Sequence, residues 1–244
     1  MIEAQGLYKS FGNINAVQDV SFIARDGEIT GLLGANGAGK TTTLRMLYTL
    51  MQPDRGAMSV DGIDAATNAI EVRRRLGVLP DARGLYRRLT ARENIEYYAQ
   101  LHGMEPAAIT KRIDQLITML EMSDFAMRCT EGFSQGQRVK TAIARALVHS
   151  PRNVILDEPT NGLDVMATRS LREFLKQLRA DGCCVLLSTH IMQEVAALCD
   201  HIVIIAHGRV VAQGTAEALR EQANAANLED AFVQLIGVAA GELQ

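Results

Sequence analysis

The sequence has no long hydrophobic run and no continuous basic stretch. No eighteen consecutive residues are apolar, and the start, Met1-Ile-Glu-Ala-Gln-Gly6, lacks the pattern of a signal peptide. We therefore expect a cytosolic chain that does not insert into a membrane. Its 25 basic and 28 acidic residues give a net charge of −3. Binding to nucleic acid or to an anionic membrane through charge alone is not expected from this balance.

Cysteines are few, and their spacing excludes the common metal and redox motifs. Four occur in 244 residues, with no C-x-x-C pair and no histidine at ligand spacing. Cys183 and Cys184 are adjacent in an apolar segment that is typical of a strand. Neighbouring strand residues point to opposite faces, so we expect both to be reduced core residues. The length is sufficient for one large domain or for one domain with an inserted lobe.

What the sequence does contain is the segment 34–42, which reads GANGAGKTT. It fits G-x-x-x-x-G-K-[ST], in which backbone N–H groups surround a phosphate, the lysine reaches the outer phosphates and the hydroxyl contacts magnesium. Residues 28–33 before it read as a short buried strand, and Leu44, Leu47 and Met51 follow at helical spacing. The phosphates would thus lie at a helix N-terminus. The alternative is a glycine-rich turn without a ligand, but such a turn does not explain an inward-facing lysine.

Alternating apolar segments lie on either side of this phosphate loop. Residues 2–26 alternate apolar and polar side chains and end at Asp26-Gly27, and Ala57-Met-Ser-Val60 ends at a second turn dipeptide, Asp61-Gly62. We predict that they form a small antiparallel sheet. Phe11 stands on a predicted loop of this region. Burial against another segment and stacking on a nucleotide base are both open for it.

Helical signals dominate residues 84–150. Thr90-Ala-Arg-Glu93 is a capping box, in which the threonine side chain bonds the third helical N–H and the glutamate reaches back. An amphipathic stripe follows at helical spacing, made of Ile109, Ile113, Leu116, Ile117 and Leu120. We predict that residues 84–150 are helical throughout and form a lobe inserted into an α/β core.

The segment Phe133-Ser-Gln-Gly-Gln137 combines a second capping box with a glycine. Ser134 and Gln137 are three positions apart, as the box requires. Gly136 is a poor residue for a first helical turn, at a cost of up to about 1 kcal/mol relative to alanine. An anion close to the exposed N–H groups would explain it. An ordinary helix start is the alternative.

Polar residues follow two further apolar segments. Residues 153–157 read as a strand that ends in Asp157, and Glu158 comes directly after it. Because ligands gather at the carboxyl ends of strands in open α/β sheets, we expect both acids beside the phosphate loop rather than in a solvated turn. Residues 183–187 read as another strand, which leads to His190. This histidine could orient the attacking water, sense a terminal phosphate or form a structural hydrogen bond.

The order and spacing of these motifs resemble the ATP-binding subunit of an ABC transporter along essentially the whole chain. The resemblance implies an α/β fold with a P-loop NTPase (RecA-like) core, a small antiparallel β subdomain and an inserted helical subdomain. Residues 1–244 would be one ABC ATPase domain. Within it, residues 1–83 and 151–220 would form the core with the β subdomain, 84–150 the helical subdomain, and 221–244 a C-terminal helical extension.

The resemblance also implies a shared nucleotide site. Residues 133–137 correspond to the signature that is normally written LSGGQ in this family. There, the signature of one copy meets the phosphate loop of a second, so that two ATP molecules lie within a head-to-tail dimer. Ser134, Gly136 and Gln137 would then bind the partner's ATP near its γ-phosphate.

Individual roles follow from the same resemblance. Thr41 would ligate Mg²⁺ and Asp157 would support it through water. Glu158 resembles the general base that polarises the attacking water, a role worth about 10²- to 10⁴-fold in rate, and His190 would contact the γ-phosphate. Phe11 stands where the family usually has a tyrosine beneath adenine, and it keeps the π face needed for stacking. The loop residues expected to bind ATP are Gly34, Asn36, Gly37, Ala38, Gly39, Lys40, Thr41 and Thr42.

Two departures from the family pattern matter for the site. The signature reads FSQGQ, with Gln135 in place of the first glycine, and Asp81 stands where the family usually has the glutamine of the Q-loop. An ionised aspartate only accepts hydrogen bonds, and phosphate repels it unless magnesium or water lies between them. Asp81 would therefore either face the nucleotide in this altered way or cap its loop toward solvent.

The implied function is an ATPase that closes as a dimer on ATP and drives a separate integral membrane permease from the cytoplasmic face. Residues 84–94, Tyr97 and Leu101-His-Gly103 resemble the efflux branch, and within it the sodium-extruding NatA-type subunits. The alternatives are a drug, polysaccharide or lipid exporter with the same engine, and a soluble ATPase acting on DNA or ribosomes. No residue argues for sodium itself, because the substrate pathway belongs to the permease.

Overall fold

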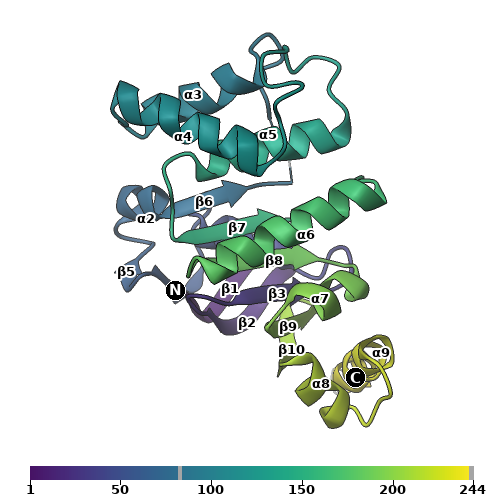
Figure 1. The fold of residues 1–244 in the computed structure, drawn as a ribbon. Coiled ribbons are helices and arrows are strands. Elements are labelled where there is room, and N and C mark those ends of the chain that lie inside the picture. The colour runs from purple at the N-terminus through teal and green to yellow at the C-terminus, as the bar shows by residue number, and fades with distance from the viewer. Residues whose placement is uncertain (82–83, 242–244) are drawn as a thin grey trace.

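A mostly parallel sheet forms the centre of the molecule (Figure 1). The computed structural model describes residues 1–81 and 84–241, so the boundary expected between 83 and 84 and the final residues 242–244 lie outside the described residues. The six strands of this sheet are β3 (Ile29–Leu33), β6 (Leu76–Leu79), β7 (Asn153–Asp157), β8 (Cys184–Thr189), β9 (His201–Ala206) and β10 (Arg209–Gly214). Their order is β10-β9-β3-β8-β7-β6, with β10 antiparallel to β9. The carboxyl ends of β3, β7 and β8 therefore meet at one edge.

The N-terminal strands form the small antiparallel sheet that the sequence predicts. Its four strands, in the order β2-β1-β4-β5, are β1 (Ile2–Phe11), β2 (Ile14–Ala24), β4 (Arg55–Val60) and β5 (Ile63–Asp64). Phe11 is the last residue of β1 and not a loop residue, because the turn to β2 begins only at Gly12, which has φ +57°. The predicted placement of Phe11 on a loop was wrong by one residue.

The helix after the phosphate loop is shorter than its sequence spacing indicates. Helix α1 (Lys40–Leu47) ends well before Met51, the last residue of the predicted pattern. The chain leaves the helix because Thr49 has φ +62°, and the N–H groups of Leu50 and Met51 both donate to the Arg45 carbonyl, at 2.9 and 3.2 Å. Bonds of this kind satisfy carbonyls at a helix C-terminus.

Other helices cover the two sheets and follow the last strand. They are α2 (Ala69–Arg75), α6 (Val165–Ala180), α7 (Met192–Leu198), α8 (Ala216–Gln222) and α9 (Leu228–Gly241). Figure 1 shows α8 and α9 together at the end opposite the top of the molecule. Within residues 1–81 and 84–241, no helix is long and apolar enough to span a bilayer.

Three helices form a lobe at the top of the molecule in Figure 1. They are α3 (Ala91–Leu101), α4 (Pro106–Met119) and α5 (Gln135–Leu147), and both predicted capping boxes are present at α3 and α5. The prediction of continuous helix is wrong for residues 84–90, 102–105, 120–134 and 148–150. Glu121 has φ +52°, which ends the helical path, and Thr90 pairs with Cys129 in an isolated β-bridge. We call α3, α4 and α5 the helical lobe.

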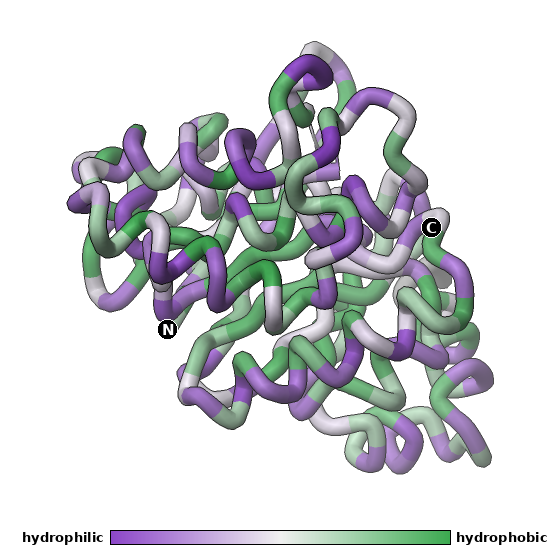
Figure 2. The backbone as a smooth tube through the Cα atoms, turned by 45° about the horizontal axis from the view of Figure 1, so that its top comes forward, coloured by the Kyte–Doolittle hydropathy of each residue, from purple (hydrophilic) through white to green (hydrophobic). Residues whose placement is uncertain are grey.

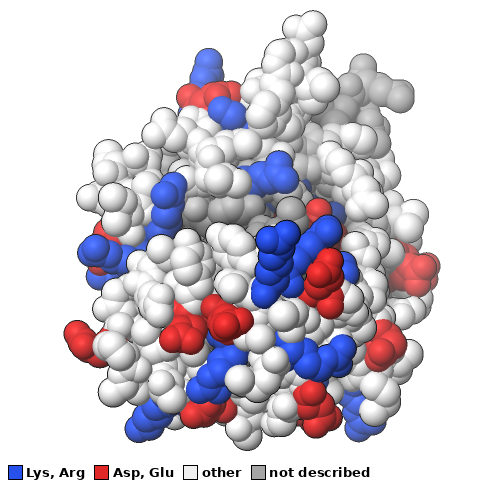
Figure 3. Space-filling view, turned by 90° about the horizontal axis from the view of Figure 1, so that it is seen from above, with Lys and Arg blue, Asp and Glu red and all other residues white. Residues whose placement is uncertain are grey.

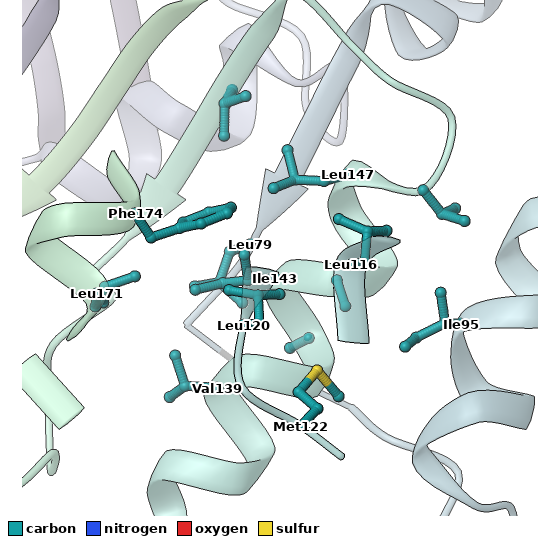
Figure 4. Packing of buried hydrophobic residues seen from close by; sticks show 14 of the residues in the cluster. Leu79, Ile95, Leu116, Leu120, Met122, Val139, Ile143, Leu147, Leu171 and Phe174 are labelled. Carbon is teal, nitrogen blue, oxygen red and sulfur yellow. The ribbon is translucent and has the colours of Figure 1, made fainter. Parts of the chain in front are cut away.

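The helical lobe shares one hydrophobic core with the central sheet. Figure 4 shows Ile143 of α5 lying among Leu79 of β6 and Phe174 of α6. A second core fills the space between the central and the antiparallel sheet, and Figure 2 shows hydrophobic segments running through the middle of the chain trace. Cys183 packs against the first core and Cys184 against the second, which confirms that they face opposite sides.

Candidate nucleotide site

The phosphate loop, residues 34–42, joins β3 to the start of α1. Gly37 and Gly39 have φ values of +82° and +107°, in a region that L side chains rarely adopt. A Cβ at Gly34 would lie only 2.3 Å from the carbonyl oxygen of Ile205, so the loop packs closely against β9. This tight path ends at the N-terminus of α1, where free backbone N–H groups favour an anion.

Lys40 lies inside this loop and is only 5% exposed. Its Nζ donates to the carbonyl oxygens of Gly34 and Ala35, at 2.7 and 3.2 Å, and stands 3.5 Å from Oε1 of Glu158. These contacts give the inward-facing lysine protein partners, which the sequence did not predict. The ammonium group therefore sits among neutral carbonyls and one carboxylate, where phosphate oxygens could replace the carbonyls.

Asp157 ends β7 and is fully buried. Its Oδ1 accepts hydrogen bonds from the hydroxyls of Ser188 and Thr41, the latter at 3.4 Å. Its Oδ2 is buried and has no hydrogen-bond partner among the described residues. Burial raises the pKa of this carboxyl, and the nearby Asp81 and Glu158 raise it further, whereas the Ser188 and Thr41 hydroxyls lower it. An orphaned carboxylate oxygen beside a hydroxyl fits a hard cation such as Mg²⁺.

Glu158 has a strained backbone at the centre of the site. Its φ of +47° is uncommon for a residue with a side chain, and its N–H donates to the carbonyl and hydroxyl oxygens of Ser188, both at 3.2 Å. Its Oε2 lies 2.9 Å from Nδ1 of His190. The carboxylate therefore lies between the ammonium of Lys40 and the imidazole of His190.

The side chains of Lys40, Glu158 and His190 line a pocket of about 280 Å³. Asp81 lines it, and also lines a neighbouring pocket of about 470 Å³ beside the signature segment. Of the two alternatives for Asp81, this placement favours a side chain that faces the nucleotide. The lining residues are Ala16, Asn36, Gly37, Gly39, Lys40, Thr41, Thr42, Asp81, Glu158, Asn161 and His190.

Sequence reasoning missed three residues of this site. Ala16 comes from β2 and Asn161 from the turn after β7, and both line the pocket. Ser188 is fully buried and holds Asp157. The strand before His190 placed Ser188 near the site, but no spacing rule joins β2 to the phosphate loop.

Phe11 does not line the pocket, and it is 47% exposed at the end of β1. The burial alternative for this side chain was wrong. The ammonium of Lys9 lies 5.9 Å from the ring centroid, a distance at which cation–π attraction acts. The ring is therefore accessible to a stacking partner, although the protein does not hold it against the phosphate loop.

The signature segment is not part of the same pocket. Ser134 Oγ accepts from the Gln137 N–H at 3.3 Å, and Gln137 Oε1 accepts from the Ser134 N–H at 3.1 Å, so the capping box is complete. Gly136 instead faces α6, where an added Cβ would lie 3.6 Å from Cβ of Ala167. Within one chain, the fold brings Asp157, Glu158 and His190 to the phosphate loop but leaves the signature apart from it.

The fold and the site define an ATPase with a phosphate-binding loop and a separate signature segment. The chain belongs to the ABC transporter family, whose model matches residues 17–161. It is 44% identical to the ABC transporter ATP-binding protein NatA of Bacillus subtilis, over 90% of both chains. It is also 38% identical to the Nod factor export ATP-binding protein I of Ralstonia nicotianae, over 88% of this chain and 67% of the other.

Solved structures agree with this family. The ATP-binding subunit of an ABC transporter aligns with a TM-score of 0.89 and 34% identity, over 97% of this chain and 99% of the other. A dimeric ATP-binding cassette in a post-hydrolysis state, bound to ADP and Pi, aligns with a TM-score of 0.81 and 27% identity, over 88% and 98%. The protein is an ATP-binding and ATP-hydrolysing subunit of an ABC transporter.

Proposed function

We propose that this chain powers the export of sodium ions through a separate integral membrane permease. The observation that carries this proposal is the identity of 44% to NatA over 90% of both chains. The efflux-type stretch at residues 84–94 supports export rather than uptake. The subunit would lie at the cytoplasmic face of the membrane, with residues 84–150 as the helical subdomain that contacts the permease.

In this proposal the phosphate loop binds ATP. The N–H groups at Gly37 and Gly39 donate to phosphate oxygens, and Lys40 exchanges its carbonyl partners for the outer phosphates. Phe11 stacks on adenine from the edge of β1. Thr41 and Asp157 would hold Mg²⁺, which supplies charge neutralisation at the phosphates when bound. The orphaned Oδ2 of Asp157 supports this assignment.

Hydrolysis then depends on the acid that follows β7. Glu158 accepts a proton from the attacking water, and His190 holds the Glu158 carboxylate through the contact of 2.9 Å. A base positioned in this way contributes about 10²- to 10⁴-fold to the rate. Asp81, which lines the same pocket, would meet the nucleotide through Mg²⁺ or water, since its carboxylate cannot donate.

A second copy of the chain would complete the site. Ser134 and Gly136 do not line the pocket that contains Lys40, so a single chain leaves one side of the nucleotide without them. A head-to-tail dimer would bring Ser134, Gly136 and Gln137 of each copy to the ATP of the other. The solved cassette at 27% identity is described as dimeric, which supports this arrangement.

The test of the cargo is transport by the whole assembly. The chain and its co-purified permease are placed in vesicles, and sodium efflux is measured with ATP on the side of this subunit. ATP-dependent sodium movement that stops in a Glu158→Gln variant is the expected result. Active ATP hydrolysis without sodium movement would reject sodium as the cargo and leave the ATPase in place.

Another cargo is the main alternative, and one observation favours it. The relative from Ralstonia nicotianae is named for Nod factor export and is 38% identical, so similar ATP-binding subunits serve different exporters. Stimulation of ATP hydrolysis by a drug, lipid or polysaccharide, but not by sodium, would select this alternative. A role on DNA or ribosomes has less support, since the face seen in Figure 3 carries basic and acidic residues interspersed rather than one basic surface.

A further inference from the structure

Gln135 stands where the family signature normally has its first glycine, and it makes a contact that a glycine could not make. It is the first residue of α5 in the helical lobe. Its Nε2 donates to the carbonyl oxygen of Asn161 at 3.4 Å. Its Cγ lies 3.2 Å from the position that a Cβ would take at Gly162. The side chain thus spans from the lobe to the turn between β7 and α6.

Gly162 leaves the space that this contact needs. Its φ of +74° lies in the region that favours glycine, and an added Cβ would also lie 3.6 Å from Nε2 of Gln135. A side chain at position 162 would therefore press on the Gln135 amide as well as strain the turn. The long residue at 135 and the absent side chain at 162 fit each other.

The turn that Gln135 contacts also carries the proposed base. The Asn161 N–H donates to the Glu158 carbonyl oxygen at 3.2 Å, and Asn161 lines the phosphate pocket together with Glu158. The same turn is fixed on its other side, where the Thr160 hydroxyl donates to Oε2 of Glu194 at 2.6 Å. Gln135 connects this turn to the helical lobe, and two hydrogen bonds, through Asn161, link it to Glu158.

We propose that Gln135 is a positioning residue for ATP hydrolysis, which holds the turn at residues 158–162, and with it Glu158, in register with the start of α5. The inference rests on the ATPase activity and on the proposed role of Glu158, not on the cargo. Loss of the amide donor would let Glu158 move away from the attacking water. ATP binding at Lys40 would be unaffected, because Gln135 does not line that pocket.

The test compares two variants of similar side-chain length in the purified full chain. Gln135→Glu removes the donor and places a carboxylate oxygen against the Asn161 carbonyl, and Gln135→Met removes the donor without adding charge. We expect kcat to fall about tenfold in both, in keeping with one lost hydrogen bond. The Kd for a fluorescent ATP analogue should stay within about twofold of the wild-type value. The Tm should stay within about 2 °C of the wild-type Tm. Gln100→Glu, on the exposed face of α3, is the matched control.

A double variant separates positioning of Glu158 from a general structural role. If Gln135 acts through Glu158, Gln135→Met should slow single-turnover hydrolysis much less in a Glu158→Gln background than in the wild type. Equal losses in both backgrounds would overturn the proposal. A loss in Gln135→Glu but not in Gln135→Met would also overturn it, because added charge and not the donor would then be the cause. Inactivity of the wild-type chain would instead reject the proposed catalytic site.

Discussion

The phosphate loop and the signature segment both lie at the start of a helix, but they differ in burial and in hydrogen-bond partners. At the start of α1, Lys40 is buried, hydrogen-bonded to its own loop and paired with Glu158. At the start of α5, Ser134 is exposed and its capping box is closed only by Gln137. The first lines a pocket together with Glu158 and His190 of the same chain, whereas the second lies outside that pocket.

This difference indicates how binding and hydrolysis are divided. Changes in the first region should alter what one chain does alone, namely the binding of ATP. Changes in the second should leave binding intact and affect only the step that needs two chains. The following variants test this division, in order of decreasing expected effect.

The largest effect is expected for Glu158→Gln. It removes the proton acceptor but keeps the size of the side chain and leaves Lys40 in place, so hydrolysis should fall about 10²- to 10⁴-fold. ATP affinity should be retained, and size-exclusion chromatography with ATP should show an accumulated dimer. Glu173→Gln on the exposed face of α6 is the control. Hydrolysis at the wild-type rate would contradict the assignment of the base.

Lys40→Ala, in the phosphate loop, should weaken the binding of ATP. The buried ammonium is expected to pair with the outer phosphates, and loss of such a charged partner weakens binding roughly 10²- to 10³-fold. The Kd for a fluorescent ATP analogue measures this directly. Lys176→Ala removes a partly exposed lysine that pairs with Glu173 on α6, and should bind ATP normally. Unchanged affinity in Lys40→Ala would contradict the phosphate site.

Gly136→Leu, in the signature segment, should impair hydrolysis and leave the phosphate loop unchanged. A bulky side chain at the start of α5 would block approach of the partner's nucleotide, and hydrolysis should fall roughly 10²-fold, as for loss of a transition-state donor. Binding of ATP by the monomer should change less than twofold. Gly237→Leu on α9, where an added Cβ meets no atom within 4 Å, controls for a glycine replaced within a helix. A collapse of monomer affinity would show that the site is not shared.

The smallest effect is expected for the stability of the fold at low pH, and it involves His149, just after α5. His149 donates through Nε2 to the Leu76 carbonyl at 3.1 Å, and its ring stacks on His102 with centroids 3.7 Å apart. Burial lowers the pKa of His149 to about 4, and the charges of His102 and Arg112 act in the same direction. The pKa of His149 is thus lower in the folded state than its ordinary value of 6.5. The stability that the neutral imidazole contributes is therefore present above pH 6.5 and is lost as the pH falls toward 4.

We therefore expect wild-type unfolding free energy to drop by about 1–2 kcal/mol more than that of His149→Gln between pH 7.5 and pH 5. Glutamine keeps a donor for the Leu76 carbonyl but does not titrate. Urea unfolding at the two pH values measures the difference. Equal acid sensitivity in the two proteins would show that His149 is not the titrating group. ATP affinity per folded molecule should not differ between them, since His149 lies outside the phosphate pocket.

Local patterns predicted the features that depend on a few neighbouring residues. The phosphate loop, the strand that ends at Asp157 and both capping boxes are set by short-range sterics and hydrogen bonds, so their spacing is visible in the chain. The ends of the helices were predicted wrongly, because an apolar stripe does not show where residues of positive φ interrupt the helix. Helix α1 ends early through bonds of its own last turn, and residues 120–134 form turns where one helical pattern passes into the next.

The sequence by itself determined that this protein binds a nucleotide phosphate, and it indicated which acids follow the strands that lead to that phosphate. Only the tertiary structure decided that Ala16 and Asn161 line the pocket and that Ser188 donates to Asp157, because no sequence spacing joins β2, β7 and β8. It also decided that Gln135 reaches the turn that carries Glu158. Spacing encodes a local turn, whereas the meeting of two elements depends on how the core packs them together.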